Sequence, residues 1–358
     1  RAVSAARPVM RVVADAGTPP DDWDARAVAI PGGHVMQSAT WAELRAEQGY
    51  EPHHLTFDDG HVALVLLRRS SGLPGAEAIV RRGPAHVGEV GPIGAARAAA
   101  LADWARESDA RSLMLDPERP AEPAYASAMA AAGFEITEGP EPSIHVMRRE
   151  LDPELTEEAL LGSFSKSTRQ RIRAAIAAGT VVVETAERGR MEAFAGLLHE
   201  RAEVVGMQLQ AGTGFVDSWR RLIAAGLARL LLAEHEGDLV GGLLLFRHGG
   251  IHATAYSADK SERRRELPGT MHLVRWTAIR DAHAEGCGAI ELGGVDLPGH
   301  RTPPAKGDPN RGLYEHKRGF GAEWIEREPA RRIVLRPNLE RLARLRRRAL
   351  GSLRGMRR

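Results

Sequence analysis

The chain alternates short apolar runs with longer amphipathic segments, and this pattern occurs twice along its length. In the first half, apolar runs at 53–57 and 61–67 flank Asp58–Asp59–Gly60, which predicts a hairpin because Asp-Gly favours a tight turn. In the second half, runs at 229–234, 239–247 and 251–257 predict a three-stranded meander. Further strands are predicted at 112–115, 134–137, 144–151, 181–184 and 289–292, and helices at 38–47, 93–107, 124–132, 166–178, 190–205, 215–225 and 268–285.

This mixture of helices, hairpins and short strands predicts an α/β (α+β) protein with two domains. The length of 358 residues exceeds the size at which one hydrophobic core stops growing. The Pro-rich stretch Glu138–Pro142 precedes the last strand of the first half, so we expect the boundary near Leu151–Asp152. The predicted domains are therefore 1–151 and 152–330, followed by a basic helical segment, 331–358.

Composition favours a folded, cytoplasmic protein without a metal site. Hydrophobic residues make up 43% and charged residues 27% of the chain, and its start has no apolar leader. The single Cys287 excludes an internal disulfide and a cysteine-cluster metal site. His53 and His54 point to opposite faces of a predicted strand, so they do not bind one ion together.

Charge is concentrated at the C-terminal end. The net charge is only +2, but residues 331–358 hold eleven arginines and one acid, Glu340, so this segment carries +10 and the rest −8. Leucines and arginines in 338–353 are spaced as in an amphipathic basic helix. Two interpretations remain open: contact with a polyanion, either RNA or the inner face of an anionic membrane, or packing of the leucines onto the body.

The segment Gly312–Gly321 carries the strongest candidate for chemistry. It places Lys317 on a short predicted helix bounded by glycines and Phe320, after a strand that ends in Glu291–Leu292–Gly293–Gly294. A lysine held there would set a positive charge beside a reacting carbonyl. The alternative is a surface lysine on a helix.

Several motifs in this order resemble those of the Fem family of peptidoglycan interpeptide-bridge aminoacyltransferases. The resemblance extends over roughly residues 20–330 and implies two tandem GNAT-like domains, here without the coiled-coil arm of some members. The matching motifs are Gln37–Arg45, Arg82–Gly83–Pro84, Leu115–Asp116–Pro117–Glu118, Lys166–Ala175 and the Lys317 segment.

The resemblance implies transfer of an aminoacyl group from aminoacyl-tRNA, a co-substrate, to an amine of a peptide acceptor, such as a cell-wall precursor or a natural-product amine. Such an ester is already activated, so the enzyme needs positioning and oxyanion stabilisation but no cofactor or metal. Lys317 matches the family lysine at the reaction centre. Asp116 is expected to orient or deprotonate the attacking amine; its alternative role is that of a turn residue before Pro117.

The resemblance also suggests binding residues. Arg45, beside Trp41, matches a position that contacts a substrate diphosphate, and Tyr256, Tyr314 and Phe320 are candidates for the acceptor groove. Packing or surface roles remain open for all of them. A predicted basic stripe of Lys166, Arg169 and Arg173 has the i, i+3, i+7 spacing of one helix face and suits tRNA phosphates, with a solvated face as the alternative.

Two departures from the expected patterns limit the assignment. The loop Gly206–Gly214 has no basic residue, which argues against a nucleotide-linked acceptor. Pro268 stands where coenzyme-A-dependent acyltransferases need a free amide for the pyrophosphate, which argues against coenzyme A. An acyl-thioester-dependent N-acyltransferase on the same fold, and a non-catalytic RNA- or membrane-binding protein, remain alternatives.

Overall fold

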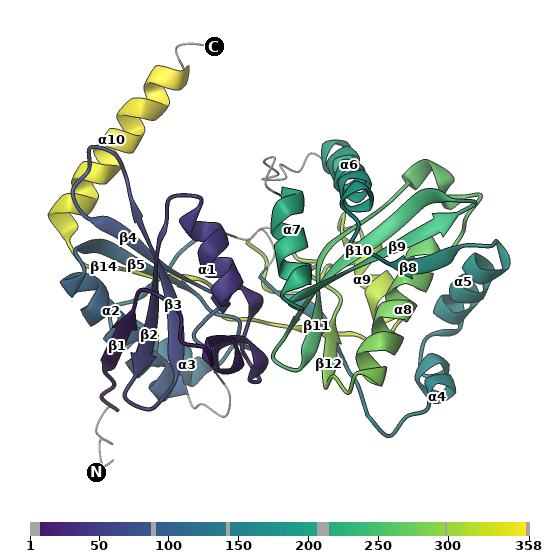
Figure 1. Ribbon diagram of the computed structural model, residues 1–358, viewed down its shortest axis with the longest axis horizontal. Helices are drawn as coiled ribbons and strands as arrows, with labels where there is room; N and C mark the ends of the chain where they lie inside the picture. Colours follow the sequence, from purple (N-terminus) through teal and green to yellow (C-terminus); the bar gives the residue numbers. More distant parts are fainter. Residues whose placement is uncertain (1–7, 87–90, 141–143, 206–214, 298, 356–358) are drawn as a thin grey trace. The chain divides into compact units, whose positions relative to one another are not determined.

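The computed structural model describes residues 8–86, 91–140, 144–205, 215–297 and 299–355. The chain divides into unit 1, residues 1–142 and 327–358, and unit 2, residues 143–326. Each unit is built on a seven-stranded sheet (Figure 1). The two predicted passes of strands and helices are therefore present as two folded units.

Unit 1 has the strand order β1-β2-β3-β4-β5-β14-β6. The pair β4·β5 is parallel and is connected by the long helix α2, whereas the other neighbours are antiparallel. Leu101 and Trp104 of α2 pack in one buried cluster with Leu113 and Leu115 of β5. The elements are β1 Val12–Ala16, α1 Ala39–Ala46, β2 Glu51–Phe57, β3 Val62–Arg69, β4 Ala76–Arg81, α2 Gly91–Glu107, β5 Ala110–Asp116, α3 Pro123–Ala131, β6 Glu135–Ile136, β14 Arg331–Val334 and α10 Pro337–Gly355.

Unit 2 repeats this arrangement with the order β13-β7-β12-β11-β10-β9-β8, and again one pair, β11·β12, is parallel. Leu243 and Leu245 of β10 pack in a cluster with Val274 of α8. Gly242 faces α6 instead, because a Cβ there would lie 2.8 Å from the ring of Phe194. The elements are β7 Val146–Glu150, α4 Glu157–Gly162, α5 Lys166–Ala177, β8 Val181–Glu184, α6 Arg188–Val205, α7 Phe215–Ala224, β9 Ala228–His235, β10 Asp238–His248, β11 Ile251–Asp259, α8 Thr270–Ala284, β12 Ala289–Glu291, α9 Arg311–Arg318 and β13 Glu323–Ile325.

The predicted domain boundaries differ from this division because two strands pair away from their sequence neighbours. β7 was assigned to the first domain, but it lies between β12 and β13 in the sheet of unit 2. β14 follows unit 2 in the chain, yet it lies between β5 and β6 in the sheet of unit 1. The boundaries accordingly fall at 142/143 and 326/327 rather than at 151/152 and 330/331.

The predicted basic helix is present as α10, but one of its two interpretations, packing of the leucines onto the body, does not hold at two positions. Leu342 is 48% and Leu345 is 64% exposed, whereas Glu340 and Ala343 are buried. The inward face is thus formed by a charged and a small residue. Across the described ranges, we find no helix whose length and apolar character would let it cross a bilayer.

Candidate active site

Lys317 lies inside unit 2, at the end of β12. Its side chain is 3% exposed, and Nζ donates a hydrogen bond to the carbonyl oxygen of Gly294 at 2.8 Å. Gly293 has φ +80, and a Cβ there would lie 3.5 Å from Nζ and 3.7 Å from Cβ of Thr254 on β11. The Oγ1 atom of Thr254 is buried without a hydrogen-bond partner among the described residues. The predicted strand–Gly–Gly and lysine segments therefore meet, beside an unsatisfied hydroxyl.

A second group of basic side chains, which the sequence had not indicated, is centred on His316, the residue before this lysine. Arg275 of α8 is 3% exposed, and its Nη1 lies 3.1 Å from Nε2 of His316 on α9. Nδ1 of His316 lies 3.1 Å from Nε2 of His272 on α8. Because a guanidinium only donates, His316 accepts at Nε2 and donates from Nδ1 to His272. The hydrogen bonds thus run from Arg275 through both rings.

Burial decides the charge of this group. It is the main cause that holds the pKa of Lys317 well below its usual value; the charge of Arg275 adds to this effect and that of Asp296 opposes it. Burial also lowers the pKa of His272 to about 4 and that of His316 to about 2. It lowers the pKa of Arg275 to about 10. At neutral pH both rings are therefore neutral, and Arg275 keeps its charge.

Asp296 is a further residue of this region that the sequence analysis missed. It is 7% exposed, and its Oδ2 accepts hydrogen bonds from the backbone amides of Ile144 at 2.6 Å and His145 at 2.9 Å. The available signal was its position two residues after Gly293–Gly294, at the end of a buried strand.

The three aromatic candidates of unit 2 lie in different surroundings. Phe320 is fully buried, with its ring centroid 5.2 Å from that of Phe164, so it supports α9 from the core and is not placed to line a groove. Tyr256 is half-buried and packs edge-on against Phe215 at 4.9 Å. Tyr314 is half-buried beneath the guanidinium of Arg311. Substrate contact for Tyr256 and Tyr314 remains a prediction.

In unit 1, Asp116 ends β5 within a network of arginines. The residue is 6% exposed, and its Oδ2 lies 3.3 Å from Nε of Arg81 and 3.7 Å from Nε of Arg82. Two guanidiniums hold the carboxylate in place. Both predicted roles of Asp116, orientation and deprotonation of the attacking amine, remain predictions.

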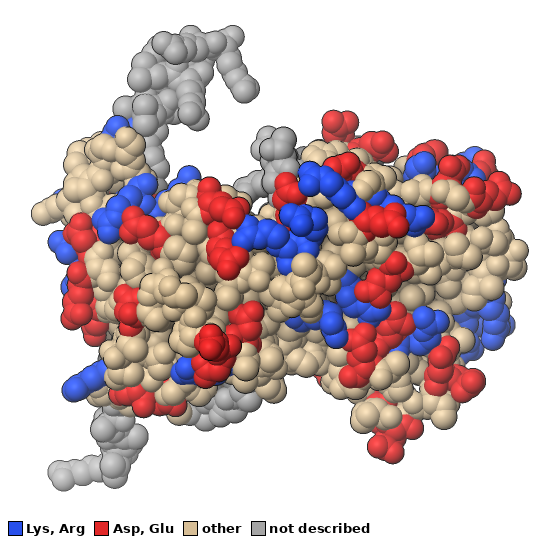
Figure 2. Space-filling model, in the orientation of Figure 1, with Lys and Arg blue, Asp and Glu red and all other residues tan. Residues whose placement is uncertain are grey.

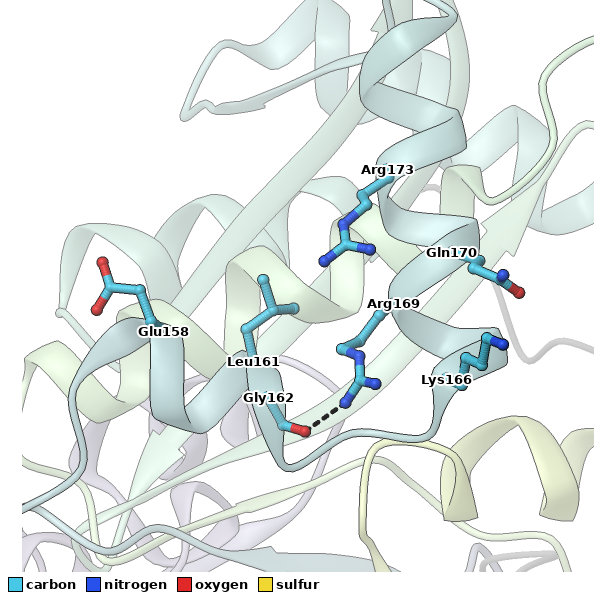
Figure 3. A pocket seen from close by; sticks show the side chains of 7 residues that line it. All are labelled: Glu158, Leu161, Gly162, Lys166, Arg169, Gln170 and Arg173. Atoms are coloured by element: carbon cyan, nitrogen blue, oxygen red, sulfur yellow. Dashed lines mark hydrogen bonds between the residues drawn. The ribbon is translucent and has the colours of Figure 1, made fainter.

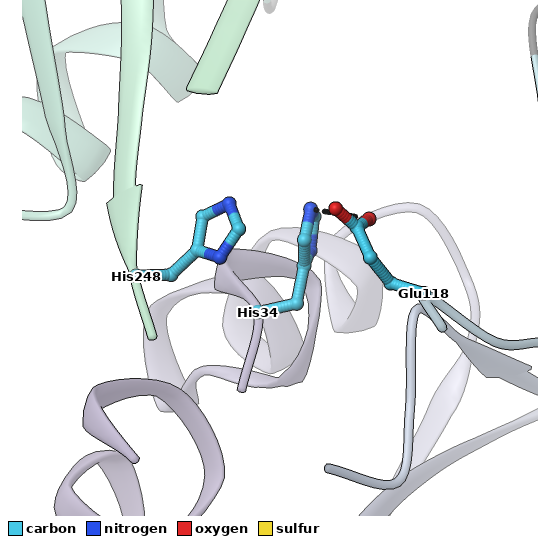
Figure 4. A group of neighbouring side chains, drawn as sticks. All are labelled: His34, Glu118 and His248. Carbon is cyan, nitrogen blue, oxygen red and sulfur yellow. Dashed lines mark ion pairs between the residues drawn. The ribbon is translucent and has the colours of Figure 1, made fainter. Parts of the chain in front are cut away.

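The network continues through Glu118, which follows Asp116 by two residues. Figure 4 shows the Glu118 carboxylate beside the ring of His34, with Oε2 3.3 Å from Nε2. Nδ1 of His34 accepts the amide hydrogen of Met36 at 3.0 Å, so the ring donates to Glu118 from Nε2. Arg327 binds the other oxygen of Glu118 at 2.8 Å.

Arg45 and Trp41 pack against each other on α1. The guanidinium lies 4.1 Å from the centroid of the Trp41 ring, and its Nη1 donates to Oε1 of Gln48 at 2.6 Å. Trp41 is 7% exposed and Arg45 half-buried. Stacking on an indole orients the guanidinium, which leaves its predicted role in diphosphate binding open.

The predicted basic stripe lines a pocket of about 480 Å³ between α4 and α5. In Figure 3, Arg169 and Arg173 point toward α4, whereas Lys166 points away from it. Arg169 donates to the carbonyl oxygens of Gly162 and Phe164 and so caps the end of α4. The three residues therefore do not form one uniform stripe, and the exposed cations available to a ligand are Lys166 and Arg173.

A group of potential metal ligands in unit 2, formed by His252, Glu285 and Cys287, is poorly suited to a cation. The carboxylate of Glu285 binds Arg229 at 2.7 Å and Arg247 at 2.8 Å. A divalent ion there would have to compete with two guanidiniums.

The predicted loop Gly206–Gly214 lies outside the described residues.

Comparisons with known proteins agree with this architecture. Residues 162–318 match the family described as "Acetyltransferase (GNAT) domain". The structure of FemX superimposes with a TM-score of 0.75 at 20% identity, covering 92% of this chain and 99% of that one. A conserved protein of unknown function from Bacteroides thetaiotaomicron gives a TM-score of 0.52 at 13% identity, covering 90% and 98%. The sequence has no match among curated proteins.

The chain therefore has the fold of FemX, a mixed α/β architecture of two units, and the GNAT match lies in the second of them. The resemblance to the Fem family that the motifs predicted is confirmed at the level of the fold.

Proposed function

We propose that the protein is an aminoacyltransferase that moves an aminoacyl group from tRNA to an amine of a peptide acceptor. The observation that carries this proposal is the position of Lys317, which is buried at the end of β12 against Gly293, Gly294 and Thr254. The fold shared with FemX and the order of the Fem-like motifs support it. A cell-wall precursor and a natural-product amine are the two acceptor classes.

In this reaction the acceptor amine attacks the ester carbonyl and a C–N bond forms. The tetrahedral oxyanion then collapses, the C–O bond to the ribose breaks, and the proton lost by the amine ends on the ribose oxygen. Lys317 is the group that stabilises the oxyanion and the leaving oxygen. Asp116 orients the acceptor, and Arg45, stacked on Trp41, binds an anionic part of it.

The donor is proposed to be tRNA rather than an acyl thioester because of the packing at the start of α8. A Cβ on Gly269, which precedes α8, would lie only 2.0 Å from the carbonyl oxygen of Arg171. A backbone carbonyl of α5 thus packs closely against the helix end that would bind a pyrophosphate. Lys166 and Arg173 remain exposed on α5 for phosphate contacts.

We expect transfer to require intact tRNA and two of the exposed cations of α5, Lys166 and Arg173. Ribonuclease should abolish transfer. Lys166→Gln with Arg173→Gln should reduce the slope of log binding constant against log salt concentration for tRNA by roughly 1.8. The measurement is amide formation from charged tRNA, together with tRNA binding across a salt series. Arg220→Gln with Lys260→Gln is the control of equal charge. Transfer that survives ribonuclease would identify a thioester-type donor instead.

The charge distribution on the face seen in Figure 2 also limits how tRNA binds. Acidic and basic side chains are interspersed there, without one continuous basic surface. On this face, a few positioned cations therefore suit tRNA phosphates better than a broad electrostatic surface.

We further propose that α10 holds the protein at an anionic membrane surface, at the cytoplasmic side where charged tRNA is available. Leu342 and Leu345 lie one turn apart and are exposed, with the exposed Arg341 and Arg344 beside them. Apolar side chains flanked by arginines suit the boundary between headgroups and acyl chains. The sequence adds five more arginines after residue 346.

We expect the protein to sediment with vesicles that contain phosphatidylglycerol and not with vesicles of phosphatidylcholine alone. Leu342→Ser with Leu345→Ser should weaken this binding about tenfold or more, because two leucines no longer enter the bilayer. Val9→Ser with Val13→Ser, a pair of similarly exposed residues, is the control. Equal binding to both vesicle types would contradict the proposal, and tRNA binding that depends on the same leucines would assign α10 to RNA.

A further inference from the structure

Within the part of the chain that the structure describes, Arg275 is a buried cation without a carboxylate partner. Its guanidinium is hydrogen-bonded to the neutral ring of His316, and its Nε has no hydrogen-bond partner among the described residues. The nearby Asp259 forms its ion pair with Arg264 instead, at 2.6 Å. Burying a charge without a counter-ion costs several kcal/mol. Core packing alone does not explain such a residue, because a methionine would fill the space at lower cost.

The hydrogen bonds fix where this charge lies. Arg275 and His272 are one turn apart on α8, and both bind the ring of His316. His316 directly precedes Lys317 on α9, and its ring also packs 5.4 Å from that of Phe320. The guanidinium is therefore held at a fixed position relative to the lysine.

The charged groups that act on Lys317 come from two elements. Arg275 approaches from α8, and Asp296 from the segment after β12. Asp296 is already bonded to two backbone amides, and the adjacent ring of His316 is neutral. Among the described residues, Arg275 is thus the cation whose charge acts on the lysine, from its position on the ring of the preceding residue, His316.

We propose that Arg275 is a positioning residue for Lys317: held on the ring of His316, the residue before Lys317, its fixed positive charge adds to burial in favouring the free amine of Lys317 over the ammonium. Under the proposed function, on which this step rests, the free amine takes the proton released by the attacking acceptor. The resulting ammonium stabilises the oxyanion and then gives the proton to the ribose oxygen as the C–O bond breaks. The protonation cycle closes with Lys317 neutral again.

The use of lysine at this position fits the proposal. The chain has 49 basic residues, of which only four are lysines: Lys166, Lys260, Lys306 and Lys317. Arginine thus supplies almost every fixed positive charge in this protein. A guanidinium does not lose its proton in a protein, whereas a lysine amine does so readily when it is buried. Lysine is therefore the residue required if the group must accept and donate a proton.

The small number of lysines makes the proposal directly measurable by NMR. Lysine labelled with ¹³C at Cε gives four signals, and Lys317→Met identifies that of Lys317. We expect the Lys317 signal to titrate at lower pH than the other three. Arg275→Met should move its midpoint upward, toward the others. Arg280→Met, at an exposed position of the same helix, is the control and should have no effect.

Two results would overturn the proposal: a Lys317 signal that titrates with the other lysines, or a low midpoint that Arg275→Met leaves unchanged. The signals of the other three lysines report whether each variant is folded. In transfer assays, Arg275→Met should reduce the rate at pH 7 about tenfold and move the acidic limb of the pH profile upward. If no charged tRNA supports transfer while the titrations hold, the proposed function fails and the assignment of Arg275 stands.

Discussion

Replacing Lys317 with methionine is expected to reduce aminoacyl transfer by about a thousandfold, the upper end of the effect of losing one oxyanion partner. The side chain is almost fully buried, and its amine is held on the Gly294 carbonyl beside the unsatisfied hydroxyl of Thr254. Methionine fills a similar volume but neither donates a hydrogen bond nor carries a proton. The reaction would then lose its only proposed proton carrier.

The measurement is single-turnover amide formation with charged tRNA in excess, which separates chemistry from donor binding. Lys306→Met is the matched control, because it removes an exposed lysine from the segment that precedes α9. The Lys317 variant should bind charged tRNA as the unaltered protein does. A rate within threefold of normal would remove Lys317 from the proposed site.

The free energy of unfolding of the same variant should be at least that of the unaltered protein. The one expected loss is about 1 kcal/mol, from the Gly294 carbonyl that no longer accepts a hydrogen bond. A buried amine beside a guanidinium is costly, as the lowered pKa of Lys317 indicates. A stability that is preserved or raised, together with lost transfer, is the pattern of a residue retained for chemistry.

Local patterns in the sequence were sufficient to predict much of the fold. The strand at 181–184 has the predicted bounds, and the Asp58–Asp59–Gly60 hairpin forms with Gly60 at φ +85. Both depend on neighbouring residues, since periodicity and turn chemistry act over a few positions. The meeting of Lys317 with Gly293–Gly294 was also predictable, because the order of motifs resembled a known arrangement.

The parts that the sequence did not predict depend on long-range pairing. β14 pairs with β5 across more than 200 residues, and β7 pairs with β12 across more than 100. Neither strand carries a local signal of its partner, because backbone pairing is nearly independent of side chains. Arg275 was missed for a related reason: nothing in its own helix shows that His316 and Lys317 will pack against it.

Glu340 illustrates the same limit and leads to the second large effect. In the sequence it is the single acid of a basic tail. In the structure it is 3% exposed and forms ion pairs with Arg111 at 3.5 Å, Arg332 at 3.0 Å and Arg344 at 3.2 Å. Arg111, on β5, is itself 1% exposed. The acid therefore joins α10 to two neighbouring strands of the sheet, β5 and β14.

Glu340→Ala is expected to lower the free energy of unfolding by about 3–5 kcal/mol, because it removes the anion that the buried Arg111 and the half-buried Arg332 share. Chemical denaturation of the variant and of the unaltered protein measures this loss. Asp103→Ala is the matched control: it breaks a helix carboxylate–arginine pair of 2.7 Å that is exposed, and should cost less than about 1 kcal/mol.

The explanation by charge is tested by removing both partners of the most buried pair. Glu340→Leu combined with Arg111→Met should recover much of the stability that Glu340→Ala loses, because replacing a buried ion pair with apolar side chains is often nearly neutral. Arg111 also binds Glu77 at 2.9 Å and the carbonyl of Gly75, so the recovery will be incomplete. If the double variant is instead less stable than Glu340→Ala, the cost lies in packing, and the charge network does not hold α10 in place.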